Sequence, residues 1–408
     1  MTNPPVTDWA NDFDTFDESY VRDPFAKWPE MRASCPVVKS ERWGGTHLVV
    51  GYEAVIEGAA NTHALTSTLG TSIANTQDDY SDSNRPKSII NSDPPDHAGP
   101  RRMMLPTMTQ RAVAKWQPVT QALCDSLIDG FLADGHADAA VDYAQKIPAT
   151  VIGRMLGVPD HLQDTFIVWV RDILEHGVEF PERRMAAFAE LGEFFIAEIA
   201  DRIQNPTDDL ISMLAHGKLE NDQVLEPRII IGNLILLLVA GIDTTWSAIG
   251  SSLWYLAQHP EDQARLRNAR DNDEPELWDT AIEELLRMFA PVSMSRVALE
   301  DTSIAGCPIP KGRRVTLSFP AANRDPSVFP DPDTVVLDRA ENRHVAFGAG
   351  IHRCAGSNLA RLELRTALQT WIDRVGPFEL ADPSTVTWAG GQVRGPRSVP
   401  VTFAPYTS

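Results

Sequence analysis

The chain has 408 residues, of which 43% are hydrophobic, so it is long enough to bury a large core. Its net charge of −20 argues against nucleic acids and anionic membrane surfaces as general partners, because phosphate contacts need clustered lysine and arginine. The four cysteines are widely spaced and form no CxxC pair, so the sequence predicts neither a disulfide framework nor a zinc site.

The N-terminal part of the chain is polar and irregular. Residues 1–20 are acidic and lack the basic and apolar regions of a secretory signal, so we expect an extended tail and a cytoplasmic protein. Residues 61–91 are rich in Ser, Thr, Asn and Asp, which is typical of a functional lid or of a solvated connector. The following segment, DPPDHAGPRR at 93–102, predicts a helix entry that places His97 and Arg101 one turn apart.

Helical patterns dominate from 111 to 286, with clear examples at 111–135, 185–203 and 229–259. The run 229–242 is apolar nearly all round and shorter than the roughly 20 residues of a membrane span, which indicates a helix through a core. Thr244 in such a helix can simply bond the carbonyl four residues back. Asp243 is harder to explain without a function, because an unpaired buried carboxylate is costly.

The next segment, TAIE at 280–283, matches a capping box and predicts a helix from there to just before Pro291. Glu284 and Arg287 share a face of this helix, although such a pair is usually an exposed ion pair of little energy. Residues 297–336 are short β-prone runs broken by Gly and Pro, and a last helix is expected at 356–375. The pattern as a whole predicts a mainly α-helical single domain with a minor β part.

The segment HVAFGAGIHRCAG, residues 344–356, carries the strongest chemical signal. Gly348 and Gly350 permit backbone conformations that a Cβ would forbid. Cys354 lies just before the last helix, where backbone N–H groups and the helix dipole lower the pKa of a thiol and stabilise a thiolate. The alternative is a buried small hydrophobic residue, which is the expectation for Cys35, Cys124 and Cys307.

Residues 347–356, FGAGIHRCAG, resemble the haem-binding signature FGxGxHxCxG of the cytochrome P450 family at every fixed position. Three further segments fall in the family's order: DPPDHAGPRR, AGIDTT at 240–245 and ELLR at 284–287. The resemblance extends from about 20 to 403, and the phrases AGIDTTWSAIG and GGQVRGP are similar to haem domains of bacterial self-sufficient fusion enzymes.

The resemblance implies the cytochrome P450 fold: a triangular helical domain spanning 1–408, with a smaller β-rich portion and no fused reductase. Haem b would be buried between the long central helix and the cysteine loop. Cys354 would be the proximal iron ligand, while Asp243 and Thr244 would relay protons to bound dioxygen. Glu284, Arg287 and Arg339 would form a structural network. The remaining residues expected to hold the cofactor are His97, Arg101, Arg296, Phe347, Gly348, His352, Gly356, Ala240 and Gly241.

The activity implied is that of a bacterial haem-thiolate monooxygenase, which uses O2 to hydroxylate or oxidatively dealkylate a small, mostly apolar organic substrate. Electrons would come from a ferredoxin and its NAD(P)H-dependent reductase, and we expect a monomer. Candidate pocket stretches are 61–91 and 166–180, and Arg394 is either a charged anchor or, preferably, a surface arginine. The single candidate pocket residues are Ile90, Leu237, Ala240, Thr244, Val292, Met294 and Val393.

A basic patch is the candidate docking surface for an acidic electron donor, although several of its members could serve haem or core contacts instead. Its residues are Arg101, Arg102, Arg343, His344, Arg353 and Arg361.

Two alternative functions remain open from the sequence. One is a peroxygenase of the same fold that uses hydrogen peroxide, against which the Asp243–Thr244 pair argues because that chemistry needs no such proton relay. The other is a haem-based gas sensor or storage protein, which would form no NADH-dependent product.

Overall fold

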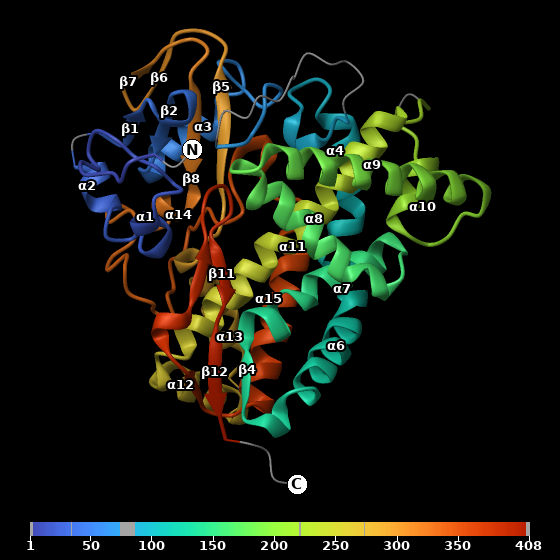
Figure 1. Cartoon of the computed structure of the whole chain (residues 1–408), viewed down its shortest axis with the longest axis vertical. Coiled ribbons are helices and arrows are strands. Elements are labelled where there is room, and N and C mark those ends of the chain that lie inside the picture. The colour runs from blue at the N-terminus through green and yellow to red at the C-terminus, as the bar shows by residue number, and fades with distance from the viewer. Residues whose placement is uncertain (1–2, 34, 74–85, 220–221, 273, 405–408) are drawn as a thin grey trace.

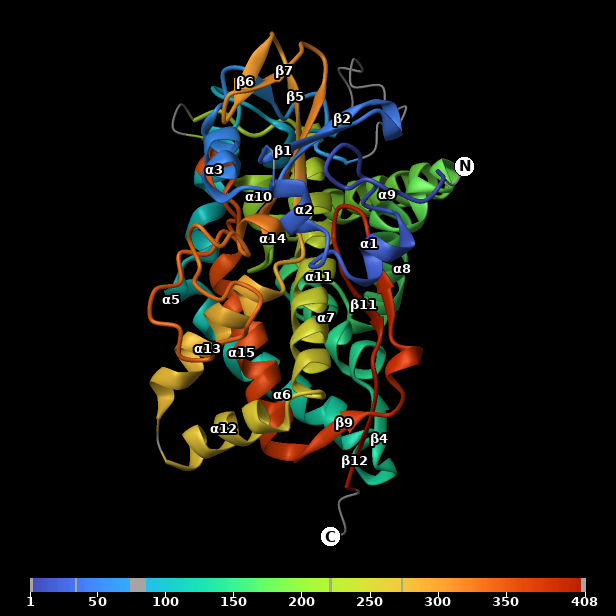
Figure 2. The same cartoon turned by 90° about the vertical axis from the view of Figure 1, so that its left-hand side faces the viewer.

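One long helix, α11 (Pro227–Leu256), crosses the centre of the molecule in both ribbon views (Figures 1 and 2). The computed structural model describes residues 3–33, 35–73, 86–219, 222–272 and 274–404. Helices α7, α8, α9, α10 and α15 and the strand β11 all contact α11. Its burial follows from its sequence, because a helix that is apolar all round needs neighbours on every side.

The helices make up most of the domain, as the sequence predicts. Besides α11 they are α1 (Glu18–Arg22), α2 (Trp28–Arg32), α3 (Tyr52–Ala60), α4 (Ala98–Met104), α5 (Gln110–Val113), α6 (Gln117–Asp129), α7 (Lys146–Leu156), α8 (Gln163–Leu174), α9 (Pro181–Gln204), α10 (Leu210–His216), α12 (Pro260–Asp271), α13 (Pro275–Met288), α14 (Phe319–Ala322) and α15 (Ser357–Arg374).

The β-rich portion lies beside the helices, at the upper left of Figure 1. Its main sheet has the strand order β1-β2-β8-β5-β3, in which only β2 and β8 pair in parallel among the described strands. The strands are β1 (Val37–Ser40), β2 (Thr46–Val49), β3 (Leu65–Thr66), β4 (His136–Asp138), β5 (Ser293–Ala298), β6 (Thr302–Ile304), β7 (Cys307–Ile309), β8 (Arg314–Ser318), β9 (Phe378–Leu380), β10 (Thr387–Ala389), β11 (Gly395–Ser398) and β12 (Pro400–Phe403).

Helix α11 is long and apolar enough to cross a membrane by length and composition, so the expectation that its apolar run is too short for a span is wrong. The helix is nevertheless 61% buried inside the protein over its most apolar window. This burial is typical of a core helix and makes the length a weak argument for a span.

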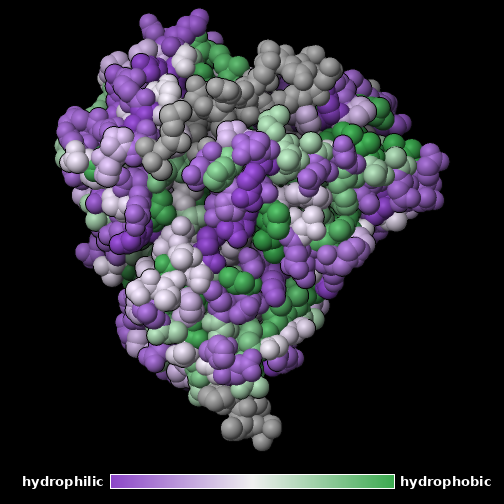
Figure 3. All heavy atoms as spheres, in the orientation of Figure 1, coloured by the Kyte–Doolittle hydropathy of each residue, from purple (hydrophilic) through white to green (hydrophobic). Residues whose placement is uncertain are grey.

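In Figure 3 the surface is a mosaic, with hydrophobic residues over α8 and α9, where Val168, Met185 and Ile196 are exposed.

Two local expectations need correction. Helix α13 begins at Pro275 and not at the predicted capping box. Thr280 lies inside the helix, and its hydroxyl donates to the carbonyl of Leu277 at 3.1 Å instead of capping an end. The N-terminal segment lacks helix and strand over the described residues 3–17, but it does not project as an extended tail. Val6, Trp9 and Phe13 are buried in a small core that they share with residues of the β-rich portion, such as Val38 and Leu48.

The cysteines also differ from expectation. Cys124 is free and buried, as predicted. Cys35 and Cys307 are not isolated hydrophobic residues but form a disulfide that joins the segment before β1 to strand β7. They are 272 residues apart, so only the fold brings them together.

Candidate active site

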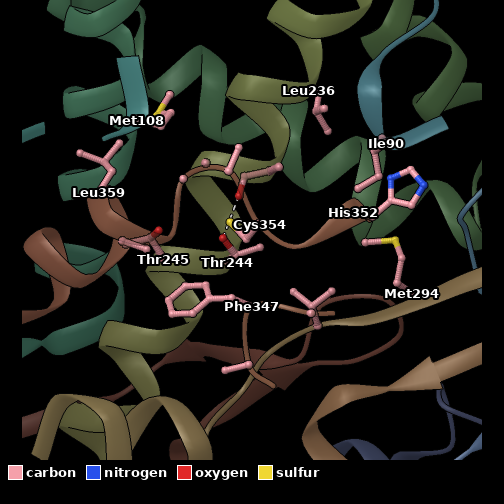
Figure 4. Close-up of a pocket in the computed structure, with 18 of the residues that line it drawn as sticks. Ile90, Met108, Leu236, Thr244, Thr245, Met294, Phe347, His352, Cys354 and Leu359 are labelled. Carbon is pink, nitrogen blue, oxygen red and sulfur yellow. Dashed lines mark hydrogen bonds between the residues drawn. The ribbon is translucent and has the colours of Figure 1, made fainter. Parts of the chain in front are cut away.

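A deep cavity lies between α11 and the loop that precedes α15, and most of its lining is apolar (Figure 4). Six of the seven predicted pocket residues line it: Ile90, Leu237, Ala240, Thr244, Val292 and Met294. Val393 does not line this cavity; it is buried and pairs with Val292 in an isolated β-bridge. The stretch 166–180 contributes no lining residue, and residues 74–85 of the predicted loop lie outside the described residues.

Cys354 faces this cavity from the loop before α15. Its backbone N–H donates to the carbonyl of Phe347 at 2.8 Å, which closes the loop. Gly348 and Gly350 both have positive φ, at 71° and 68°, as the sequence indicates. A Cβ at Gly350 would lie 2.5 Å from the carbonyl oxygen of Ala59, so the loop depends on this glycine twice over.

The predicted lowering of the Cys354 thiol pKa is wrong for the polypeptide alone. Burial raises this pKa above its usual value, and the Gly356 N–H together with Arg101, Arg353 and Arg361 only offset part of the effect. A neutral thiol is therefore favoured until a cation arrives, since a metal ion deprotonates a coordinating thiol by its own charge.

A cluster of basic side chains lies at one edge of the cavity. The rings of His97 and His352 are 4.7 Å apart, and Arg101 and Arg296 line the same cavity. Burial lowers the pKa of Arg296 to about 10, and burial together with Arg296 lowers that of His352 to about 3. His97 is buried and its Nε2 has no hydrogen-bond partner within the described residues.

This cluster fits an acidic ligand. The two guanidinium groups, Arg101 and Arg296, lie near each other in a partly buried site, which costs free energy unless an anion compensates their charge. The unpaired Nε2 of His97 also lacks a hydrogen-bond partner in the part of the chain that the structure describes. The carboxylates of a haem would supply both the compensating charge and the acceptor. The opposing Cys354 and the apolar lining between them suit the rest of such a cofactor.

Helix α11 contributes an acid and an alcohol that face different ways. Thr244 lines the cavity, and its hydroxyl donates to the carbonyl of Ala240 at 2.7 Å (Figure 4). Asp243 is buried behind the helix, where its Oδ1 lies 2.9 Å from Nη2 of Arg397. Burial raises the pKa of Asp243, and Arg397 counteracts this rise.

Arg397 was not foreseen from the sequence. It also lies 3.0 Å from Glu175 and 4.3 Å from the centre of the Trp246 ring. The sequence indicated Arg397 only indirectly, because the buried carboxylate of Asp243 is costly unless a cation pairs with it. Nothing local identifies which arginine supplies it. Arg394, the arginine that the sequence did single out, does not line the cavity and is therefore no charged anchor there. It is partly exposed, as a surface arginine would be, but it donates to the carbonyl of Val21 at 2.8 Å, and burial lowers its pKa to about 9.

The structure brings the expected network of Glu284, Arg287 and Arg339 together on the proximal side. Glu284 and Arg287 are both fully buried, with Oε2 and Nε 2.7 Å apart. Arg339 Nε lies 3.0 Å from the same carboxylate. Arg287 further donates to the carbonyls of Asn323, Pro332 and Thr334, so one ion pair ties α13 to the coil before the cysteine loop.

Part of the predicted basic patch is already engaged inside the protein. Arg361 and His344 both contact Glu283, at 2.6 and 2.9 Å. Arg101 donates to the carbonyl of Arg353 and lines the cavity. Arg343 and Arg353 are exposed at the surface.

The geometry fits a class of oxygenase in which one cysteine faces a helical alcohol, Thr244, across an apolar cavity with an anion-binding edge, while the neighbouring acid, Asp243, is buried behind the helix. The family model for cytochrome P450 matches residues 149–381 of this chain. The chain therefore belongs to the cytochrome P450 family and is a haem-dependent monooxygenase.

Relatives from several bacteria support this assignment. The chain is 37% identical to nocardicin C N-oxygenase of Nocardia uniformis subsp. tsuyamanensis, over 78% of this chain and 79% of that protein. It is 34% identical to the steroid C26-monooxygenase of Mycolicibacterium smegmatis, over 92% and 91%.

Solved structures show the same fold. The cytochrome P450 PksS of the Bacillus subtilis 168 bacillaene polyketide synthase superposes with a TM-score of 0.86 at 28% identity, covering 96% of this chain and all 100% of that one. The myxobacterial CYP267B1, solved with myristic acid, gives 0.86 at 31% identity, over 96% and 99%.

Proposed function

We propose that Cys354 is the axial ligand of haem b and that the protein hydroxylates or oxidatively dealkylates a small, mostly apolar substrate. The observation that carries this proposal is the cavity itself, in which the thiol of Cys354 and the hydroxyl of Thr244 face a common space lined by aliphatic side chains. When bound, haem supplies the iron at which dioxygen is activated. The basic edge, with His97, Arg101, Arg296 and His352, supports the proposal that the haem carboxylates would bind there.

The protein's own groups then have separate tasks. The apolar lining excludes water and holds the substrate without a charged anchor. Thr244 holds its hydroxyl oxygen at the cavity wall, and Asp243, the next residue on α11, is the acid that would supply protons to the site. Glu284, Arg287 and Arg339 fix the coil that presents the cysteine loop and touch no reacting atom.

We further propose that electrons come from a ferredoxin and its NAD(P)H-dependent reductase, that the protein is a cytoplasmic monomer, and that residues 1–408 form one haem domain. Exposed Arg343 and Arg353 near the cysteine loop suit an acidic electron donor. A product that forms with NADH, ferredoxin and reductase, and not faster with hydrogen peroxide, supports this over a peroxygenase.

The ligand assignment is tested on the purified haem protein, reduced under carbon monoxide. The wild type is expected to show the red-shifted Soret band of thiolate ligation, and Cys354→Ser is expected to lose it. Cys124→Ser is the matched control, because Cys124 is the other free cysteine among the described residues and lies in the core. A band that persists in Cys354→Ser, or a wild type that takes up no haem, contradicts the proposal. Screening small apolar compounds for a low-to-high-spin shift then identifies the substrate class.

A further inference from the structure

The segment 86–92 lies unusually close to the first half of α11. The backbone N–H of Lys87 donates to the carbonyl of Arg228 at 3.1 Å. A Cβ placed on Gly232 would lie 2.4 Å from the carbonyl oxygen of Lys87 and 2.6 Å from its carbonyl carbon. The two backbones therefore touch at a point that only glycine permits.

The next residue of the helix, Asn233, fixes this contact. Its side chain is fully buried, with 0% exposure. Its Oδ1 accepts the backbone N–H of Ile89 at 3.1 Å, and its Nδ2 donates to the carbonyl of Ile229 at 2.8 Å. Both halves of the amide are thus satisfied, which a buried asparagine requires. Asn233 itself does not line the cavity.

The segment that Asn233 holds in place does line the cavity. Ile89 and Ile90 form the short helix Ile89–Asn91 and contribute to the cavity wall, and Figure 4 shows Ile90 beside His352. The short helix is locked internally as well, because the Ser92 hydroxyl donates to the Ser88 carbonyl at 2.7 Å. This unit is therefore attached to α11 by the buried Asn233 amide and by the Lys87–Arg228 backbone hydrogen bond, and Gly232 allows the two backbones to meet.

We propose that Asn233, with Gly232, is a positioning residue for substrate recognition: it fixes the 86–92 segment so that Ile89 and Ile90 form a wall of the substrate pocket. This inference rests on the proposed haem site. It goes further by naming Asn233 and Gly232 as the residues that determine how well a bulky molecule packs against the pocket wall. The reacting atoms never touch Asn233, so its effect appears in ligand selectivity and not in haem ligation.

The test uses the intact haem protein and two iron-binding probes, imidazole and 4-phenylimidazole, titrated by the Soret shift. Imidazole needs only the iron, whereas the phenyl ring must pack against the wall. In Asn233→Leu we expect the dissociation constant for 4-phenylimidazole to rise by about tenfold, because the ring loses part of its apolar contacts when one wall moves, while that for imidazole changes less than about twofold.

Other variants separate positioning from general damage. Asn233→Asp keeps an oxygen for the Ile89 N–H and is expected to restore part of the selectivity. Gly232→Ala must displace Lys87 and is expected to reproduce the selectivity change even where Asn233→Leu folds poorly. The controls are Ser252→Ala, a buried residue bonded to its own helix, and Gly192→Ala, whose added Cβ meets nothing within 4 Å.

An unchanged ratio of the two dissociation constants in both Asn233→Leu and Gly232→Ala overturns the inference. This includes an equal loss of affinity for both probes, which leaves the ratio unchanged and indicates a general change at the haem. Failure of the proposed function looks different: the wild type itself would lack the thiolate band, or would take up no haem and bind neither probe.

Discussion

Nη2 of Arg397 lies 2.9 Å from Oδ1 of Asp243, so the acid of the central helix is held by strand β11 on the side away from the cavity. The strand can approach α11 this closely because of Gly395, where a Cβ would lie 2.1 Å from the hydroxyl of Ser247. A second acid, Glu175, shares the guanidinium at 3.0 Å. Any proton that reaches Thr244 through Asp243 therefore depends on an ion pair that joins distant parts of the chain.

Replacing Arg397 by Met is expected to lower the free energy of unfolding by about 3–5 kcal/mol, because a buried carboxylate loses its partner. Adding Asp243→Asn to that variant should recover a large part of the loss, since the stranded charge is gone. Urea unfolding of the four members of this cycle measures the coupling. Arg22→Met is the control, because its ion pair with Glu18 is 76% and 89% exposed and such pairs contribute about 0–1 kcal/mol. Additive effects of the two substitutions would contradict the coupling.

Arg287→Lys is expected to destabilise the protein by about 3 kcal/mol or more and to lower the yield of haem protein. Lysine cannot donate along two directions to Glu284 and also reach the three backbone carbonyls that Arg287 contacts. Arg154→Lys is the matched control, because Arg154 also binds a carboxylate through two nitrogens, with Asp160, but at the surface. Equal losses of unfolding free energy in the two variants would show that the burial of the Glu284 pair has no effect.

Glu363 on α15 gives a pH-dependent prediction. Burial raises its pKa from 4.5 to about 8, so the folded protein keeps a proton that the unfolded chain releases between those values. Its contribution to stability is therefore complete below about pH 4.5 and is lost as the pH rises towards 8. Glu363→Gln carries no such proton.

The stability advantage of Glu363→Gln over the wild type should thus grow with pH, by at most about 1.4 kcal/mol per pH unit, and level off above pH 8. Unfolding free energies at a series of pH values measure it. Glu379→Gln, which changes an exposed glutamate on β9, is the control for replacing a glutamate at the surface. A difference between Glu363→Gln and the wild type that stays constant with pH would mean that Glu363 is ionised in the folded protein.

Gly350→Ala and Gly312→Ala form a matched pair in the left-handed region, with φ of 68° and 80°. An alanine at 312 meets nothing within 4 Å and is expected to cost only the backbone strain of about 1–2 kcal/mol. An alanine at 350 also collides with the Ala59 carbonyl, so it should cost more and displace the cysteine loop. The reduced carbon monoxide spectrum should then lose thiolate character in Gly350→Ala alone. Retention of the full thiolate band in Gly350→Ala would show that the loop tolerates the collision.

The sequence alone determined the features that depend on neighbouring residues. The positive φ angles of Gly348 and Gly350, and a final helix within a residue of its predicted ends, follow from local chemistry. The apolar run of α11 determined that this helix is buried, and the order of the motifs determined the family. Local reasoning failed where one pattern is compatible with two positions in a helix. The segment TAIE at 280–283 matches a capping box at a helix start, yet it lies inside α13.

Only the tertiary structure decided which distant side chains meet. Asp243 and Arg397 are 154 residues apart, Ile89 and Asn233 are 144 apart, and Cys35 and Cys307 are 272 apart. Burying the two polar pairs is costly unless their partners meet, and the disulfide needs its two sulfur atoms within bonding distance. Packing of the whole chain brings these partners together, and neither partner's local sequence carries that information. The thiol of Cys354 shows the same limit, because its burial in the fold raises its pKa more than the Gly356 N–H and the nearby arginines lower it.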